Sequence, residues 1–257
     1  MATLRGPEGC PWDREQTLDS LKPFVLEEAY EVIDAIDRHD HAALREELGD
    51  FLFEAVFLAE LEAEAGRFDM ADSIEAVADK LVRRHPHVFA GEAGAPRPLS
   101  ADQVRTRWEE IKARERGAAE QPGTLLSGIA PALPALLRAW HISQRAASVG
   151  FDWTAPGDVV EKIEEEVAEL RQAVTQSGQA GTSAEDEMGD LLFSIANLSR
   201  KLGIEPETAL RKANDKFTRR FEQMERAILA SGRTMGAMTL DEWEREWHRA
   251  KSGQRAE

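Results

Sequence analysis

The most constraining feature of the sequence is an internal repeat, because one series of short motifs occurs twice in the same order. A tryptophan follows each series at a comparable distance, Trp108 in the first copy and Trp243 or Trp247 in the second. A solenoid would need more and shorter copies, so we expect one unit of three to four helices used twice. The motifs are Glu-Glu-x-x-Glu at 27–31 and 165–169, Glu-x-Gly-Asp at 47–50 and 187–190, and Asp-Lys-x-x-Arg-Arg at 79–84 and 215–220.

The pattern of apolar residues predicts an all-α fold. Apolar side chains recur at steps of three and four, and alternating β-branched runs are missing. The pattern predicts helices over 18–36 and 42–65, with Thr17 as the N-cap of the first. A third helix is expected to begin near Asp72, in a capping box with Glu75, and to stop before Pro86.

Breaks in this pattern define the expected domains. Residues 91–100, rich in Gly, Ala and Pro, are expected to form a loop, and a short charged helix is expected over 104–116. We predict an N-terminal helical domain over 1–116, a linker over 117–128 and a C-terminal helical domain over 129–257.

Composition excludes several classes of function. The 257 residues carry 48 Asp and Glu against 32 Lys and Arg, a formal charge of −16, which disfavours nucleic acid as a partner. The single Cys10 cannot form an intramolecular disulfide, which is typical of a reducing compartment. The N-terminus lacks the apolar core of a signal peptide, and the longest apolar run, 129–137, contains two prolines. We therefore expect a cytoplasmic protein with no membrane partner.

The acidic motifs predict a metal site. Glu166 and Glu169 share one side of a predicted helix, as do Glu187 and Asp190 on the next helix. Acidic clusters are often just solvated surface, but Glu166 falls within an apolar stripe, and so does Glu28 in the first copy. Two carboxylates about 6 Å apart repel by roughly 3 kcal/mol at an effective dielectric of 20. A cation is therefore expected among them, either a lysine or, better suited to oxygen ligands, Mg²⁺ or Mn²⁺.

Two other metals fit the sequence less well. A di-iron bundle needs Glu-x-x-His pairs, and none of the six histidines lies three residues after a glutamate. Zinc would need histidine or cysteine ligands at suitable spacing, which are missing.

Positive charge concentrates on one predicted helix that begins at Pro206. Steps of four residues place its basic side chains on one face. Such a face can simply pair with nearby glutamates on the surface, but beside a carboxylate metal site it favours phosphate binding. Its members are Lys212, Lys216, Arg219 and Arg220.

Together these motifs resemble the MazG family of nucleoside triphosphate pyrophosphohydrolases, which belong to the all-α pyrophosphatase superfamily. The resemblance rests on the repeated acidic motifs and on the runs at 10–13, 83–89 and 149–153. It implies Mg²⁺-dependent hydrolysis of nucleoside triphosphates between the α- and β-phosphates, giving a monophosphate and pyrophosphate in nucleotide-pool house-cleaning. It also implies a homodimer whose two chains complete four-helix bundles.

The resemblance also implies roles for individual residues. Glu166, Glu169, Glu187 and Asp190 would hold the metal, and Glu165 would aid water activation. Lys216 and Arg220 would contact the phosphates, assisted by Asn214, and Trp247 would lie near the nucleotide. His141 and Gln144 stand where related sequences often carry lysines, so no substrate contact is assigned there.

The two copies are not equivalent in sequence. The second copy is expected to be the principal site, because Pro86 shortens the basic helix of the first and Ala78 stands where the second has Asn214. An alternative hypothesis is a non-catalytic helical dimerisation or regulatory module with a structural cation. The first copy preserves a second-tier set of site residues: Glu28, Glu31, Glu47, Asp50, Lys80 and Arg84.

Overall fold

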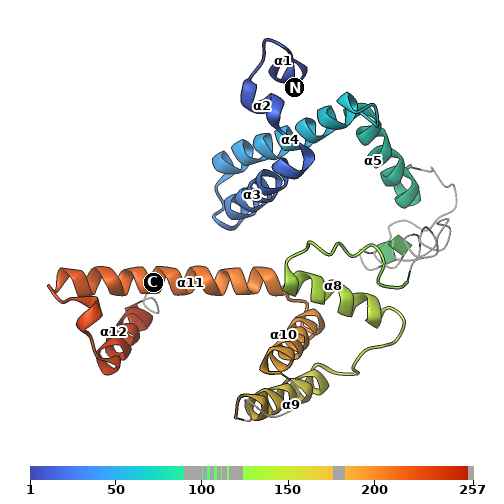
Figure 1. Cartoon of the computed structure of the whole chain (residues 1–257). Helices are drawn as coiled ribbons and strands as arrows, with labels where there is room; N and C mark the ends of the chain where they lie inside the picture. Colours follow the sequence, from blue (N-terminus) through green and yellow to red (C-terminus); the bar gives the residue numbers. More distant parts are fainter. Residues whose placement is uncertain are drawn as a thin grey trace. The chain divides into compact units, whose positions relative to one another are not determined.

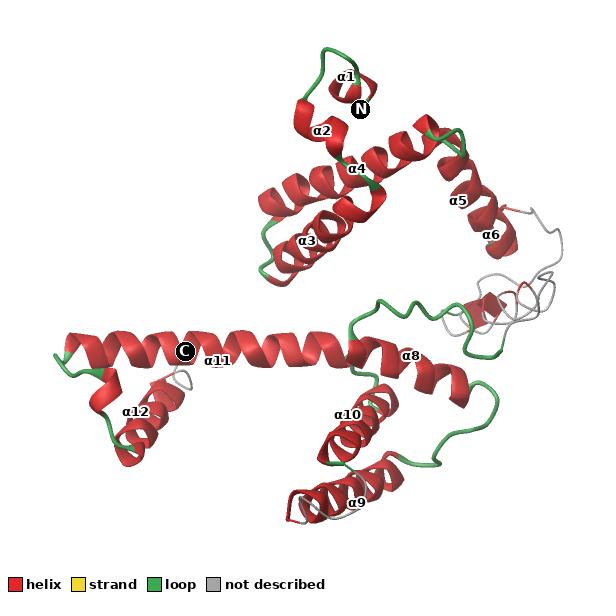
Figure 2. Ribbon diagram, viewed as in Figure 1, coloured by secondary structure: helices red, strands yellow, loops and turns green. Residues whose placement is uncertain are grey.

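Every regular element that the structure describes is a helix, which confirms the all-α prediction (Figures 1 and 2). The structure is a computed structural model that describes residues 1–89, 100, 103–104, 107–108, 111, 115, 124–175 and 183–253. The chain divides into two compact units, Met1–Ala118 and Ala119–Glu257. All but the last residue of the loop expected over 91–100, most of the helix expected over 104–116 and the first part of the expected linker lie outside the described residues.

The first unit is built around a helical hairpin. Helices α3 and α4 pack along each other (Figure 1). Leu21 and Phe57 are fully buried. Two short helices precede this pair, and α5 and α6 follow it. The helices are α1 (Ala2–Arg5), α2 (Pro11–Glu15), α3 (Leu18–Asp37), α4 (His41–Glu64), α5 (Met70–Arg84) and α6 (Pro86–Phe89).

Local capping chemistry explains where these helices begin. The hydroxyl of Thr17 accepts from the Ser20 amide at 3.2 Å, and the Ser20 hydroxyl accepts from the Thr17 amide at 2.9 Å. This arrangement confirms Thr17 as the N-cap of α3. The capping box of α5 pairs Asp69 with Asp72. The prediction that Asp72 itself begins the box was therefore wrong by one helical turn, because either aspartate suits the N-cap position.

The second unit repeats the hairpin and extends it. Helices α9 and α10 pack along each other, α8 packs on α10, and α12 folds back on the long α11 (Figure 1). Pro206 stands at the first position of α11, and the Glu205 carboxylate caps it by accepting from the Glu207 and Thr208 amides. The elements are α8 (Ala135–Ala147), α9 (Pro156–Thr175), α10 (Ala184–Lys201), α11 (Pro206–Ala230), the 3₁₀ helix η1 (Met235–Ala237) and α12 (Leu240–Gly253).

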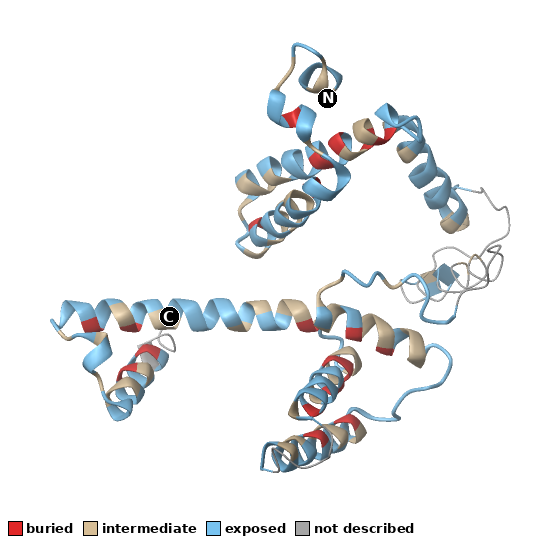
Figure 3. Ribbon diagram, viewed as in Figure 1, coloured by how far each residue is buried: buried red, intermediate tan, exposed pale blue. Residues whose placement is uncertain are grey.

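Both hairpins expose a large apolar face. On α4 the side chains of Leu48 and Leu52 are exposed, and on α10 Met188 and Leu192 occupy the equivalent positions and are exposed as well. Figure 3 shows exposed stretches of ribbon on both helices. Sizeable exposed apolar patches mark interaction surfaces more often than ordinary protein surface. The described helices of each unit therefore leave part of the apolar face of its own hairpin exposed. No helix in the described part of the chain has both the length and the apolar character needed to span a membrane.

Candidate active site

The α9–α10 hairpin brings three predicted ligands together. Glu166, Glu169 and Glu187 each place one carboxylate oxygen within 4.8 Å of the other two. Glu166 is only 4% exposed and Glu187 only 6%. Glu169 is exposed, but burial of Glu166 and Glu187 removes much of the water that would screen the repulsion between the carboxylates. Burial and the neighbouring Glu187 accordingly raise the pKa of Glu169 above its ordinary value.

Asp190 lies on the same helix but outside this trio. It follows Glu187 by three residues and its side chain is exposed. The structure therefore brings together three of the four predicted metal ligands within 4.8 Å and leaves Asp190 one helical turn away.

Lys162 is a member of the site that the sequence analysis did not single out. Its ammonium lies 2.8 Å from a Glu165 oxygen and 2.9 Å from a Glu166 oxygen. Hydrogen bonds to Glu165 and Glu166 raise the pKa of this lysine, so it stays charged. The signal was present in the sequence, because Lys162 precedes Glu166 by four residues and so shares its helix face. One lysine faces several carboxylates, so the cluster keeps a net negative charge.

The α3–α4 hairpin of the first unit forms a similar cluster. One oxygen from each of Glu28, Glu47 and Asp50 comes within 4.8 Å of the others. Burial, followed by repulsion from Glu31, raises the pKa of both Glu28 and Glu47. The Glu28 Oε2 atom is buried without a hydrogen-bond partner. A buried carboxylate oxygen without a hydrogen-bond partner is suited to pair with a cation.

The two clusters differ in their immediate neighbours. The position four residues before Glu166 is Lys162, whereas the position four residues before Glu28 is Phe24. The position seven residues after Glu187 is Ser194, whereas the equivalent residue after Glu47 is Glu54. Glu54 was also missed by the sequence analysis. It is buried, its Oε2 atom has no hydrogen-bond partner, and burial raises its pKa.

Both clusters fit a hard divalent cation. Their donor atoms are all carboxylate oxygens, the ligand type that Mg²⁺ and Mn²⁺ take. Neither cluster contains the histidine or cysteine that zinc prefers.

The predicted phosphate-binding residues lie on α11. Lys216 and Asn214 are exposed, and Trp247 of α12 packs against Phe217 with ring centroids 5.1 Å apart. In the described part of the second unit α11 packs on α8, α10, η1 and α12. Helix α9, which carries Glu166 and Glu169, is not among these packing partners. Within one chain, α11 therefore packs mainly on helices other than the one that supplies two of the carboxylates.

Two of the corresponding basic residues of the first unit, Arg83 and Arg84, pair with a carboxylate. Arg84 lies 2.6 Å from a Glu115 oxygen, and Arg83 lies 2.8 Å from the other. These two guanidinium groups lower the pKa of Glu115 to about 2. Helix α5 ends at Arg84, as expected from Pro86, and Lys80 is exposed on the same helix. Arg84 in the first copy therefore faces a carboxylate of its own chain.

Fold and site together define a class: an all-α protein in which two helical hairpins each carry an acidic cluster suited to a metal ion. The chain belongs to the MazG family, since residues 16–89 and 156–224 each match the MazG nucleotide pyrophosphohydrolase domain.

Relatives agree with this assignment. The chain is 48% identical to a nucleoside triphosphate pyrophosphohydrolase of Escherichia coli K12 over 98% of its own length and 94% of the relative. It is 44% identical to the nucleoside triphosphate pyrophosphohydrolase/pyrophosphatase MazG of Thermotoga maritima, over 98% of its length and 93% of that protein. It is also 39% identical to the uncharacterized protein YabN of Bacillus subtilis, of which it covers 50%.

Proposed function

We propose that this chain hydrolyses nucleoside triphosphates between the α- and β-phosphates, releasing a nucleoside monophosphate and pyrophosphate. The observation that carries the proposal is the close trio Glu166, Glu169 and Glu187, two of them buried, in a chain whose relatives carry the name of this activity. House-cleaning of the nucleotide pool in the cytoplasm is the setting we propose, supported by the lone cysteine and the acidic composition.

Mg²⁺ is the proposed cofactor, with Mn²⁺ as a substitute. Glu166, Glu169, Glu187 and Asp190 would hold it, because their oxygens suit a hard cation and their mutual repulsion disfavours the empty cluster. When bound, such a cation supplies Lewis-acid activation of water and neutralises charge on the phosphates.

The remaining roles fall to side chains around the carboxylates. Lys162 holds Glu165 and Glu166 in place through its two ion pairs. Glu165, exposed beside the cluster, accepts a proton from the attacking water as the new oxygen–phosphorus bond forms. Lys216 and Arg220 stabilise the pyrophosphate, which leaves as the bond between the α-phosphorus and the bridging oxygen breaks. Asn214 and Trp247 contact the nucleotide.

A homodimer would complete this site. The apolar faces of α4 and α10 are exposed, and α9 is not among the main packing partners of α11 in its own chain. A second copy explains both features if its α11 reaches the carboxylates of the first and the hairpin faces pack together into four-helix bundles.

We propose that the domains span 1–116 and 129–257, joined by a linker over 117–128. We also propose that the second copy is the principal site. The basic residues of the second copy lie within the long helix α11, which runs from Pro206 to Ala230, whereas α5 of the first copy ends at Arg84, which pairs with Glu115. The first copy fits the second candidate function, a non-catalytic module with a structural cation. The orphaned Glu28 oxygen favours a cation there, and the Arg84–Glu115 pair disfavours phosphate.

The test is hydrolysis of mixed nucleoside triphosphates with Mg²⁺ in water enriched in oxygen-18. Attack at the α-phosphorus places the heavy oxygen in the monophosphate and leaves the pyrophosphate unlabelled. Label in the pyrophosphate would contradict attack at that atom, and no hydrolysis at all would leave only the structural-module function.

A further inference from the structure

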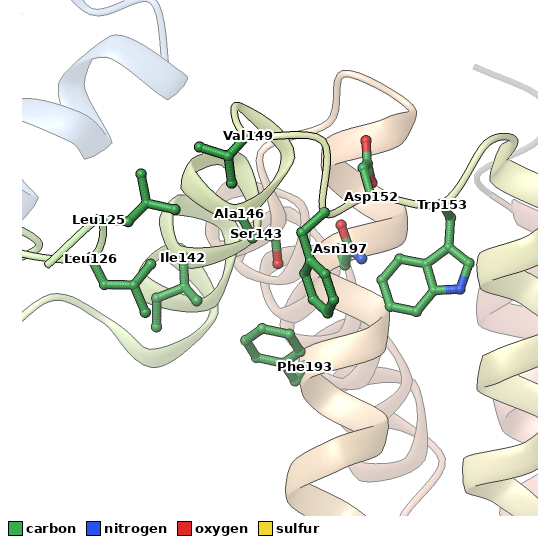
Figure 4. Close-up of a pocket in the computed structure, with 11 residues that line it drawn as sticks. Leu125, Leu126, Ile142, Ser143, Ala146, Val149, Asp152, Trp153, Phe193 and Asn197 are labelled. Carbon is green, nitrogen blue, oxygen red and sulfur yellow. The ribbon is translucent and has the colours of Figure 1, made fainter. Parts of the chain in front are cut away.

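The two hairpins differ in the segments that follow their acidic motifs. On α10, Phe193 and Asn197 line a cavity of about 350 Å³ (Figure 4). On α4 the equivalent of Asn197 is Phe57, which is fully buried. Between these positions, α10 carries Ser194 where α4 carries Glu54. The first copy therefore has a carboxylate where the second has a hydroxyl, and the proposed hydrolysis does not use that carboxylate.

Glu54 is buried without a partner. The residue is only 8% exposed, and its Oε2 atom has no hydrogen-bond partner among the described residues. The Oε2 atom of Glu28 on α3 is in the same situation. A buried carboxylate is strongly unfavourable as a charge unless a cation pairs with it or a proton neutralises it. Two such oxygens on packed helices therefore call for positive charge between them.

The geometry of the hairpin directs these two glutamates toward each other. An oxygen of Asp50 lies within 4.8 Å of a Glu28 oxygen, and Glu54 follows Asp50 by one helical turn, about 6 Å along the axis. Side chains on a helix tilt toward its N-terminus. Because the chain reverses between α3 and α4, Glu28 tilts toward the level of Glu54, and Glu54 tilts back toward the level of Glu28.

The electrostatics agree with this convergence. Burial is the largest cause that raises the pKa of Glu28, and the charges of Glu31, Asp50, Glu47 and Glu54 raise it further. The carboxylate of Glu54 therefore acts on that of Glu28, although Glu54 lies outside the acidic motif.

The second copy shows what occupies the equivalent position. Lys162 stands where the first copy has Phe24, and its ammonium lies 2.9 Å from a Glu166 oxygen. Taken together, Lys162 and Ser194 carry one positive charge, whereas Phe24 and Glu54 carry one negative charge. One divalent cation supplies this difference of two charges.

We propose that Glu28 and Glu54 hold a divalent cation between α3 and α4, at the position equivalent to that of the Lys162 ammonium in the second copy. Carboxylate oxygens are the ligands that such a hard cation takes, and water completes its coordination. The site needs Glu54, which distinguishes it from the cluster of Glu28, Glu47 and Asp50. The inference deepens the structural role proposed for the first copy, on which it rests, and the ion stays bound without nucleotide.

The test is Mn²⁺ binding to the full chain, stripped of metal with a chelator and assayed without nucleotide. The decrease in the electron paramagnetic resonance signal of free Mn²⁺ gives the affinity of the tightest site. Glu54→Gln removes the charge and keeps the shape, so it is expected to weaken that site by at least about tenfold, because ligand charge controls affinity at such sites. Mn²⁺ should also raise the Tm of wild type more than that of Glu54→Gln, since the ion binds the folded state.

The matched control is Glu46→Gln, because Glu46 is exposed on the same helix and carries the same charge. This variant should keep the wild-type affinity within about twofold, since an exposed charge is well screened. A double variant, Phe24→Lys with Glu54→Ser, gives the first copy the side chains of the second. It is expected to abolish the tight site, and it keeps the test decisive if Glu54→Gln does not fold.

Unchanged tight binding in folded Glu54→Gln or in the double variant would overturn the site. No tight binding to wild type would overturn it too, and would show that a proton neutralises Glu54. An equal loss in Glu46→Gln would show that overall charge, rather than ligation, controls binding, and would also overturn it. Pyrophosphate release separates these failures from failure of the hydrolase, because every variant keeps the carboxylates of the second copy and should release pyrophosphate at the wild-type rate. No release by wild type would refute the hydrolysis and leave the cation site standing.

Discussion

At the level of single residues, the chain contains glutamates whose carboxylate oxygens are buried without a hydrogen-bond partner. Glu54 is 8% exposed, and one of its carboxylate oxygens has no hydrogen-bond partner. A charge in such a place lowers stability, because burial costs the solvation of the charge and nothing replaces it. Sequence reasoning found Glu28 and Glu166 from their apolar flanks but missed Glu54, since no motif marks it.

Replacing Glu54 with glutamine is expected to stabilise the protein at neutral pH. Burial raises the pKa of Glu54 in the folded state, so its favourable, protonated contribution is present below the ordinary glutamate pKa and is lost as the pH rises through the raised value. Glu54→Gln should therefore gain on the order of 1 kcal/mol near pH 7.5, and progressively less toward pH 4. Urea unfolding across this range in the presence of a chelator measures the difference.

The exposed Glu15 supplies the control for that measurement. Glu15→Gln should leave the free energy of unfolding within about 0.5 kcal/mol of wild type at every pH. A gain for Glu54→Gln that does not grow with pH would contradict the buried-charge explanation.

At the level of elements, the sequence predicted what local chemistry controls. The hairpin helices follow from periodicity, α3 from the Thr17 cap, and α5 and α11 from Pro86 and Pro206. Two features were out of reach. Two aspartates compete for the N-cap of α5, and only packing decides between them. The sequence predicts α4 as a helix with an apolar stripe, yet Leu48 and Phe51 of that stripe are exposed in the structure. Periodicity identifies the apolar stripe but does not say which surface covers the stripe.

In the candidate site, too, some features follow from sequence spacing and others only from packing. Motif spacing predicted that α9 and α10 bring carboxylates together, as Glu166, Glu169 and Glu187 do. The ion pairs of Lys162 and the cavity around Asn197 depend on how helices face each other, which spacing alone does not define.

The pairing of α11 with α12 is expected to be a separate packing unit within the second copy. Ile228 is fully buried there with Met224 and Ala250. Ile228→Ala should cost about 2–4 kcal/mol, the usual range for truncating a buried aliphatic side chain. Hydrogen exchange should accelerate in α12, where Trp247 lies, while α9 and α10 stay protected.

The exposed Gln223 on α11 offers the matched control, because Gln223→Ala keeps helix propensity and removes no buried contact. Equal acceleration in α10 and α12 would show instead that the whole unit unfolds as one.

At the level of the whole molecule, the proposed dimer makes a quantitative prediction. If α11 of one chain serves the carboxylates of the other, a chain with Glu187→Gln and a chain with Lys216→Met and Arg220→Met are each inactive alone. In a mixed dimer, one site collects all three substitutions and the other is wild type. Random mixing should therefore restore about a quarter of wild-type activity. A mixture as inactive as its components would show that each site is built from a single chain.

The most direct test of the central claim is pyrophosphate release by two matched single variants, Glu187→Gln and Glu47→Gln, in the full chain with Mg²⁺. The two positions are equivalent in the repeat, and each contributes one oxygen to its own acidic cluster. Loss of a ligand at the working site should lower kcat by at least about 100-fold, so Glu187→Gln should nearly abolish release while Glu47→Gln keeps it. Wild-type release by folded Glu187→Gln protein would contradict the assignment of the chemistry to the second copy.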